Sequence, residues 1–160
     1  MRLSHLADYA VVLMTAAARF PEGARLSATV LAEDTGVPLP TAQKLMGQLA
    51  GAGLLVSHRG ASGGFSLSRP AADISLADIV EAVEGPIAMS ACSSGGYDCA
   101  LDSHCRVKPH LGLVGHAVRG ALGAVSLQQL CSPAKAGVQA GEAVRSAPRD
   151  WAPASAGARQ

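Results

Sequence analysis

The stretch LAEDTGVPLPTAQKLMGQLAGAGLLVSHRGASGGFSLSRP, residues 31–70, holds the end of one helical pattern, a second helical pattern and an alternating pattern broken by glycines. The first helix is predicted to begin after Ser27, whose hydroxyl can cap the free N–H groups of a first turn. It carries Val30 and Leu31 toward the core. It ends at Gly36, because glycine readily adopts the left-handed conformation of a tight turn.

The second helix of this stretch is predicted to open at Pro38 or Pro40, since proline is favoured in the first turn of a helix. Apolar residues then recur at helical spacing until glycines end the pattern. They are Leu45, Met46 and Leu49, followed by Gly51 and Gly53. Two short helices joined by a turn are typical of a helix-turn-helix.

Residues 54–68, LLVSHRGASGGFSLS, predict a β-hairpin directly after the second helix, and hence a wing. The apolar members of its strands are expected to be Leu54 and Val56 before the glycines and Phe65 and Leu67 after them. Arg59 falls near the tip, where a guanidinium can enter a minor groove or bind a phosphate. An arginine at a hairpin tip is often only solvated. In this chain, however, a helix pair precedes the hairpin, which favours contact of Arg59 with DNA.

Outside this stretch, apolar periodicity predicts three more helices, over residues 3–19, residues 75–84 with Ser75 as N-cap, and residues 107–125. Residues 132–160 are rich in Ala, Gly, Pro and Ser without periodicity and are predicted to be a disordered tail, in which Trp151 has no explanation. The predicted fold class is mainly α with a small β-hairpin, that is, a winged helix-turn-helix followed by a long dimerisation helix.

The helix predicted over residues 107–125 carries an apolar seam with alternating spacings of four and three. The seam consists of Val107, Leu111, Val114, Val118, Ala121 and Val125. A heptad-like repeat of this kind can pack on a helix of the same chain or on a second copy. Its length and regularity favour a subunit interface, so we expect a homodimer that binds a palindromic double-stranded DNA site.

The charge of the chain is more informative in its distribution than in its total. The net charge is only +1 over 160 residues, of which 49% are hydrophobic, enough for one core with appendages. Residues 35–72 nevertheless contain no acidic residue, while they include Lys44, His58, Arg59 and Arg69. Such a window presents a locally positive surface suited to phosphate, although a few cations can also form a plain solvated face.

Several functional classes are excluded by the sequence. The apolar run from Tyr9 to Ala18 is too short to span a bilayer, and His5 and Asp8 precede it where a signal peptide would be free of charge. We therefore expect a cytoplasmic protein without a membrane partner. No nucleophile with a base partner, phosphate-cradling loop or usefully spaced pair of acids is present, so an enzyme is not expected.

Cys92, Cys99 and Cys105 lie in a Gly/Ser-rich segment, with six and then five residues between them. The segment has no strand or helix periodicity that would make them small core residues, so they are interpreted as ligands of a metal or cluster. Thiolates are soft, anionic donors that suit iron–sulfur clusters. Zinc would accept the same ligands, but a structural zinc site usually has two cysteines separated by about two to four residues. Cysteines that form reversible disulfides without a metal are a further alternative.

Four passages together resemble the family of bacterial iron–sulfur-responsive transcription regulators typified by IscR and NsrR, which includes regulators of suf-type cluster assembly. The passages are MRLSHLADYAV, the helix pair LAEDTGVPLPTAQKLMGQLAGAGLL, the wing RGASGGFSLSRP with SLADIVEAVEG, and the three cysteines before SLQQL. They cover about residues 1–131. The wing signature combined with three spaced cysteines is specific, whereas any one passage alone would be weak.

The resemblance implies a dimeric winged-helix repressor or activator whose DNA affinity depends on a 2Fe-2S or 4Fe-4S cluster held by the three cysteines. The IscR-like branch takes its fourth ligand from a histidine three residues after the last cysteine, where this chain has Lys108, followed by Pro109 and His110. The NsrR-like branch uses an acidic residue on the first helix of the partner subunit. Asp8 holds the matching place and is the preferred fourth ligand, although it can also be a solvated residue beside His5.

The residues expected to read DNA lie on the N-terminal half of the second helix of the helix-turn-helix, namely Thr41, Gln43 and Lys44, with Arg59 in the wing. Gln43 can pair bidentately with adenine, whereas Lys44 can bind phosphate or guanine. Gln43 can also be an exposed helix former without a role. By resemblance to suf-type regulators, the expected targets are genes of iron–sulfur cluster assembly.

The alternatives are a nitric-oxide-responsive regulator of the same family, a cluster-free thiol or zinc repressor, and a cluster-carrying scaffold protein. The predicted organisation is a DNA-binding domain over residues 1–85, a cysteine loop over 86–106, a dimerisation region over 107–131 and a tail over 132–160. The iron–sulfur-dependent DNA-binding regulator is the preferred reading, since the acid-free window favours DNA over protein contacts.

Overall fold

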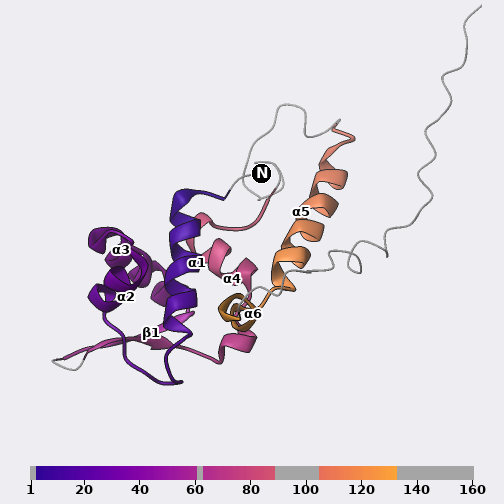
Figure 1. The fold of residues 1–160 in the computed structure, drawn as a ribbon. Helices are drawn as coiled ribbons and strands as arrows, with labels where there is room; N and C mark the ends of the chain where they lie inside the picture. Colours follow the sequence, from indigo (N-terminus) through magenta and orange to yellow (C-terminus); the bar gives the residue numbers. More distant parts are fainter. Residues whose placement is uncertain (1–2, 61–62, 89–104, 133–160) are drawn as a thin grey trace, which may run out of the picture.

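The computed structural model describes residues 3–60, 63–88 and 105–132. Within them the chain is mainly helical with one two-stranded antiparallel hairpin, which confirms the predicted fold class. Figure 1 shows the elements in chain order. They are α1 (His5–Ala17), α2 (Ala28–Thr35), α3 (Leu39–Gly51), β1 (Leu55–His58), β2 (Gly64–Leu67), a 3-10 turn (Ala71–Asp73), α4 (Leu76–Glu84), α5 (Lys108–Gly123) and α6 (Leu127–Cys131).

The helix-turn-helix forms from local signals. The Ser27 hydroxyl accepts the N–H of Val30 at 3.1 Å and caps α2 as predicted. Gly36 ends α2 in the left-handed conformation with φ of 74°, and Pro40 lies in the first turn of α3. One expectation was wrong, because Val30 is 44% exposed whereas Leu31 is fully buried. Residues adjacent in a helix point about 100° apart, so only one of the two can face the core.

The hairpin pairs β1 with β2 from Leu55 opposite Leu67 to His58 opposite Gly64. The expected alternation of Leu54 and Val56 was wrong. Leu54 lies before the strand, Leu54 and Leu55 are both buried, and Val56 is 44% exposed. The reason is that Leu54 ends the turn after α3 and packs inward there, so the strand alternation starts only at Leu55.

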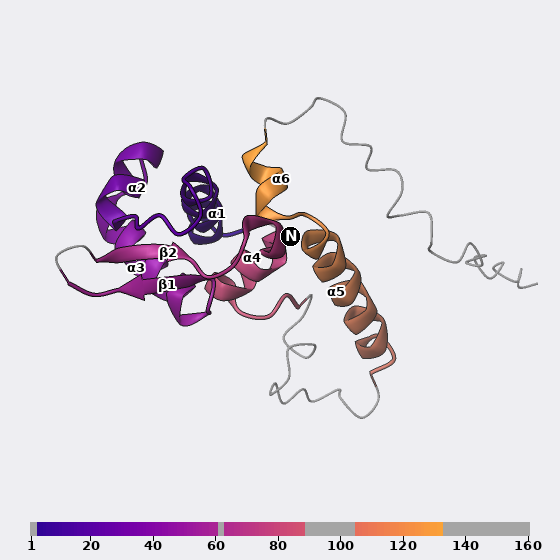
Figure 2. The same cartoon turned by 90° about the horizontal axis from the view of Figure 1, so that it is seen from below.

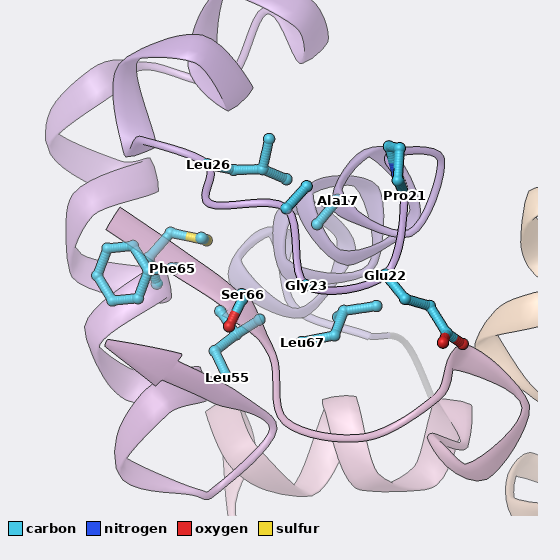
Figure 3. A pocket seen from close by; sticks show the side chains of 11 residues that line it. Ala17, Pro21, Glu22, Gly23, Leu26, Leu55, Phe65, Ser66 and Leu67 are labelled. Atoms are coloured by element: carbon cyan, nitrogen blue, oxygen red, sulfur yellow. The ribbon is translucent and has the colours of Figure 1, made fainter. Parts of the chain in front are cut away.

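A backbone bridge joins the hairpin to the loop between α1 and α2. The N–H of Leu26 donates to the carbonyl of Phe65 and the N–H of Phe65 donates to the carbonyl of Leu26, each at 2.8 Å. Figure 3 shows Leu26, Leu55 and Phe65 around a small crevice at this junction. The base of the wing is thereby fixed to the body of the domain.

One core joins α1, α2, α3, the hairpin and α4. Its largest fully buried side chains are Leu13, Met14, Leu31, Leu45, Met46, Leu49, Ile74, Ile79, Leu127 and Val80. Burial of leucine-sized side chains stabilises a fold by roughly 1.5–3 kcal/mol each. The core therefore holds the helix-turn-helix and the base of the wing in a defined relative position.

Helices α5 and α6 behave differently, although both lie in residues 107–131, which were predicted to form one dimerisation region. Figures 1 and 2 show α5 beyond α4, away from α2 and α3. In contrast, α6 returns to the core, where Leu127 is fully buried and its N–H donates to the Ile74 carbonyl at 2.7 Å. No helix in the described part of the chain is long and apolar enough to cross a membrane.

Candidate nucleic-acid interface and metal site

The first turns of α3 present the predicted readout residues. Gln43 and Lys44 are exposed, whereas Thr41 is half-buried. Ala42 and Leu45, which lie between and beside them, are fully buried and fix the rotation of the helix. The two long polar side chains therefore point to solvent from a rigid helix, as contact with base edges requires.

The hairpin brings Arg59 to solvent immediately after β1. Two glycines on the returning side are required by the packing of the backbone. A Cβ on Gly63 would lie 2.6 Å from the carbonyl oxygen of His58, and a Cβ on Gly64 would lie 2.8 Å from that of Leu26. The glycine-rich sequence thus serves the close packing of the hairpin as well as its accessibility.

An open groove separates the hairpin from the helix-turn-helix. Its lining combines residues of α2, α3 and the hairpin, namely Ser27, Ala28, Thr29, Gln43, His58, Gly60, Gly63, Gly64 and Phe65. The Nε2 atom of His58 lies 2.9 Å from the hydroxyl of Ser66. From the sequence, His58 was expected only to contribute to the positive window. Its place beside Arg59 in the predicted hairpin was the one signal that could have marked it, because the groove itself is formed by elements that are apart in the sequence.

Arg69 belongs to the packing of the domain rather than to this surface. Its Nη2 lies 3.2 Å from Asp78 Oδ2, and its Nε donates to the Asp73 carbonyl at 2.9 Å. Partial burial opposes ionisation of Asp78, but the N–H and hydroxyl of Ser75 together with Arg69 outweigh it and lower the pKa of Asp78. Of the two arginines in the acid-free window, Arg59 is the one that is exposed to solvent.

The predicted metal ligands are only partly described by the structure. Cys105 is half-buried and lies three residues before α5, and Asp8 is exposed in the first turn of α1. Cys92 and Cys99 lie outside the described residues. Within the described part of the chain, no three His, Cys, Asp or Glu residues come together as a metal site. The ligand set therefore stays a prediction.

Two glutamates of α4 connect the region of the predicted ligands to the DNA-binding domain. Glu84 Oε1 accepts the N–H of Ser4, the N-cap of α1, at 2.8 Å. Glu81 Oε1 accepts the N–H of Ile87 at 3.4 Å and the Nε–H of Arg119 on α5 at 3.0 Å. One end of α4 thus contacts the start of α1, the chain leading to the cysteine segment, and α5.

Cys131 ends α6, 26 residues after Cys105 in the sequence. Its Sγ is 3.6 Å from the Thr15 carbonyl, and it packs against the core. Burial raises the pKa of this thiol, an effect only partly opposed by the charge of Arg19. A protonated, half-buried thiol of this kind is a poor nucleophile.

The family model described as Rrf2, iron-dependent transcriptional regulator, matches residues 3–133. An HTH-type transcriptional regulator of Mycobacterium tuberculosis is 36% identical over 88 residues, which is 55% of this chain and 55% of that protein. The chain thus spans about half the length of the curated relatives it matches. The family and these relatives are transcriptional regulators rather than enzymes.

Two solved structures have the same fold. CymR, the global cysteine regulator of B. subtilis, superposes with a TM-score of 0.63 at 24% identity, covering 82% of this chain and 96% of CymR. IscR of T. potens superposes with a TM-score of 0.59 at 27% identity, covering 81% of this chain and 85% of IscR. Both are winged-helix structures, so the helix-turn-helix and hairpin described above are the common architecture.

Proposed function

The chain belongs to the Rrf2 family of transcriptional regulators, and from this premise we propose that it is a homodimeric DNA-binding repressor controlled by an iron–sulfur cluster. The observation that carries the proposal is that the DNA-binding elements and α5 lie on two sides of α4. A helix-turn-helix with a wing lies on one side, and on the other lies a helix that starts three residues after Cys105.

For DNA, the proposal assigns base contact to Gln43 and phosphate or guanine contact to Lys44. Both are exposed on α3, which supports the assignment, and Arg59 is exposed in the adjacent hairpin. Thr41 is half-buried, so its role is contact with the sugar–phosphate backbone beside the helix rather than deep insertion into the groove.

For the dimer, the proposal places a second copy against α5. Val107 is 56% exposed, Leu113 is 68% exposed and Val114 is 44% exposed. Apolar side chains on a helix that packs on only one side are usually covered in the assembled protein. A two-fold pair of helix-turn-helix units then matches a palindromic operator.

For the cofactor, the proposal assigns Cys92, Cys99 and Cys105 as ligands, with Asp8 of the partner subunit as the fourth. The donor set supports this. Three thiolates and one carboxylate suit an iron–sulfur cluster, whereas harder cations such as Mg²⁺ and Ca²⁺ prefer a site made of oxygen ligands. When bound, such a cluster supplies a group that responds to iron, oxygen or nitric oxide. The exposure of Asp8 on α1 leaves its carboxylate accessible to a partner.

For coupling, the proposal uses the contacts of α4. Glu84 holds the N-cap of the helix that carries Asp8, and Glu81 contacts both Ile87 and Arg119. A change in the cysteine segment would therefore alter the position of α1 and α5 relative to the helix-turn-helix. Such control is a difference in DNA-binding free energy between the cluster-bound and cluster-free states.

For the regulated genes, we place suf-type iron–sulfur cluster assembly first, because the segment from Cys99 to Arg106 and the SLQQL passage are most similar to that branch. A nitric-oxide-responsive regulator is the second candidate. The specific observation that favours it is Asp8 in the first turn of α1, the place that the NsrR-like branch uses for its acidic ligand.

The test is to purify the full chain anaerobically and record its visible spectrum with its iron and sulfide content, beside a Cys99→Ser variant. A coloured wild type and a bleached variant support the cluster. DNA binding with and without the cluster then tests control. A colourless protein after careful reconstitution overturns the cluster and leaves a zinc-containing or thiol-based repressor.

A further inference from the structure

The groove between the helix-turn-helix and the hairpin is lined mostly by polar and small residues. It contains hydroxyls from Ser27 and Thr29, the amide of Gln43 and the imidazole of His58, but no acidic residue. Glycines at 60, 63 and 64 leave much of its hairpin side without side chains, apart from His58 and Phe65. An anionic ligand would meet hydrogen-bond donors here and no repelling charge.

The position of the groove identifies the anion. A helix in the major groove and a hairpin in the adjacent minor groove lie on either side of one sugar–phosphate backbone. Gln43 is on the helix side of the groove, and Arg59 directly follows His58 on the hairpin side. When both elements engage DNA, the backbone between them must pass over this lining.

His58 has the chemistry to hold that backbone. Its Nε2 is engaged by the Ser66 hydroxyl at 2.9 Å, and Ser66 itself is only 9% exposed, so the ring is held from within the hairpin. When the hydroxyl donates to Nε2, the neutral ring carries its proton on Nδ1 and can donate it outward. The imidazolium can donate from Nδ1 as well.

We propose that this groove binds a backbone phosphate of the DNA duplex, with His58 as the donor and Ser66 as the residue that positions the ring. The proposal rests on the DNA-binding function proposed above and adds a phosphate contact between the recognition helix and the wing. Thr29 also lines the groove, and in this proposal its hydroxyl is a second donor to the same backbone.

The experiment measures binding of the full chain to a duplex that the wild-type protein has selected from a random-sequence pool. His58→Ala and His58→Leu both remove the ring nitrogens, and the leucine variant keeps the side-chain volume in the strand. Each is expected to bind about tenfold more weakly, the effect of losing one hydrogen bond to a charged group. The control is Ser57→Ala, since Ser57 is exposed, lies next to His58 and does not line the groove.

Two further readouts separate a phosphate contact from a structural role. Phosphates of the duplex are replaced one at a time by neutral methylphosphonates. At one position, this replacement should lower the DNA affinity of the wild-type protein but hardly change that of His58→Leu. Ser66→Ala should weaken binding less than His58→Leu, and the double variant should be no weaker than His58→Leu alone, because both act through one contact.

Wild-type affinity in His58→Leu, or equal sensitivity of both proteins to every methylphosphonate, would overturn the groove assignment while DNA binding itself stands. A wild-type protein that selects no duplex would overturn the proposed function and this inference together. The two failures are thus distinguished by the wild-type measurement alone.

Discussion

Helices α3 and α5 have similar apolar periodicity, yet they end in opposite environments. On α3, Leu45 and Leu49 are fully buried in the core of the chain. In the apolar seam of α5, Val107 is 56% exposed and Val114 is 44% exposed. The comparison shows that an apolar repeat identifies the face of a helix that avoids water, but does not tell whether the same chain covers that face.

The two regions also differ in how they use charge. In the acid-free window, the side chains of Gln43 and Lys44 on α3 and of Arg59 in the hairpin are exposed, so a partner molecule can reach them. The acidic residues Glu81 and Glu84 of α4 instead accept hydrogen bonds from Arg119, Ile87 and Ser4 of the same chain. Polar and charged side chains thus stay exposed in the first region, whereas in the second they connect segments of the same chain.

The largest effect on stability is expected from a substitution on the buried face of α3. Leu49→Ala should lower the free energy of unfolding by about 3 kcal/mol, because it removes a leucine side chain from a closed core. Urea denaturation followed by circular dichroism measures this. Val30→Ala on the exposed face of α2 is the control and should change stability by less than about 0.5 kcal/mol. Equal losses in both variants would contradict the core described here.

The matching substitution on α5 should break assembly rather than folding. Val114→Asp places a charge in the proposed interface and should weaken the dimer at least about a hundredfold, while the helical content of each subunit is kept. Analytical ultracentrifugation over a concentration series measures it. His116→Asp adds the same charge on a different side of α5 from the seam and should leave the dimer intact. A Val114→Asp dimer as tight as wild type would show that α5 is not the interface.

A smaller effect is expected at the connection between the two regions. Glu81→Gln removes the charge that holds Arg119 and should reduce the ratio of DNA affinities with and without the cluster by about fivefold. Thermal stability should hardly change, since Arg119 is half-exposed and such ion pairs contribute little. Glu22→Gln is the charge-matched control in an exposed loop. An unchanged ratio in Glu81→Gln would remove α4 from the proposed coupling.

The smallest effect concerns acid stability at the start of α4. The pKa of Asp78 is lowered in the folded chain, so its contribution is present above the ordinary aspartate value and is lost as pH falls through the folded pKa. Asp78→Asn should therefore lower the free energy of unfolding by less than about 1 kcal/mol near neutral pH, with the difference vanishing in acid. Thermal unfolding between neutral and acidic pH checks it, and a difference that grows toward low pH would contradict the sign.

Much of the fold was predictable because its signals are local. Ser27, Gly36 and Ser75 end or begin helices through contacts within a few residues, and the structure has all three in those roles. The errors at Val30 and Val56 have a different origin. Their exposure depends on the rotation of a helix and on the start of a strand, which packing against α1 and the core sets.

The candidate site was predictable to a similar extent. Gln43, Lys44 and Arg59 are exposed where the helix-turn-helix and wing patterns placed them. His58 was not singled out, because its importance comes from a groove formed by three elements that are apart in the sequence. The roles of Cys92, Cys99, Cys105 and Asp8 stay predictions from spacing and resemblance.

By itself, the sequence determined the order and type of the main elements, though not the short helix α6, since capping residues, glycines and apolar periodicity act over one or two helical turns. Only the tertiary structure decided which apolar face is covered and which polar groups meet. It buries Leu127 of α6 in the core and leaves Val114 of α5 exposed. It also joins α4 to α5 through Glu81 and Arg119, 38 residues apart. Contacts between distant segments depend on how the whole chain packs, which no local pattern encodes.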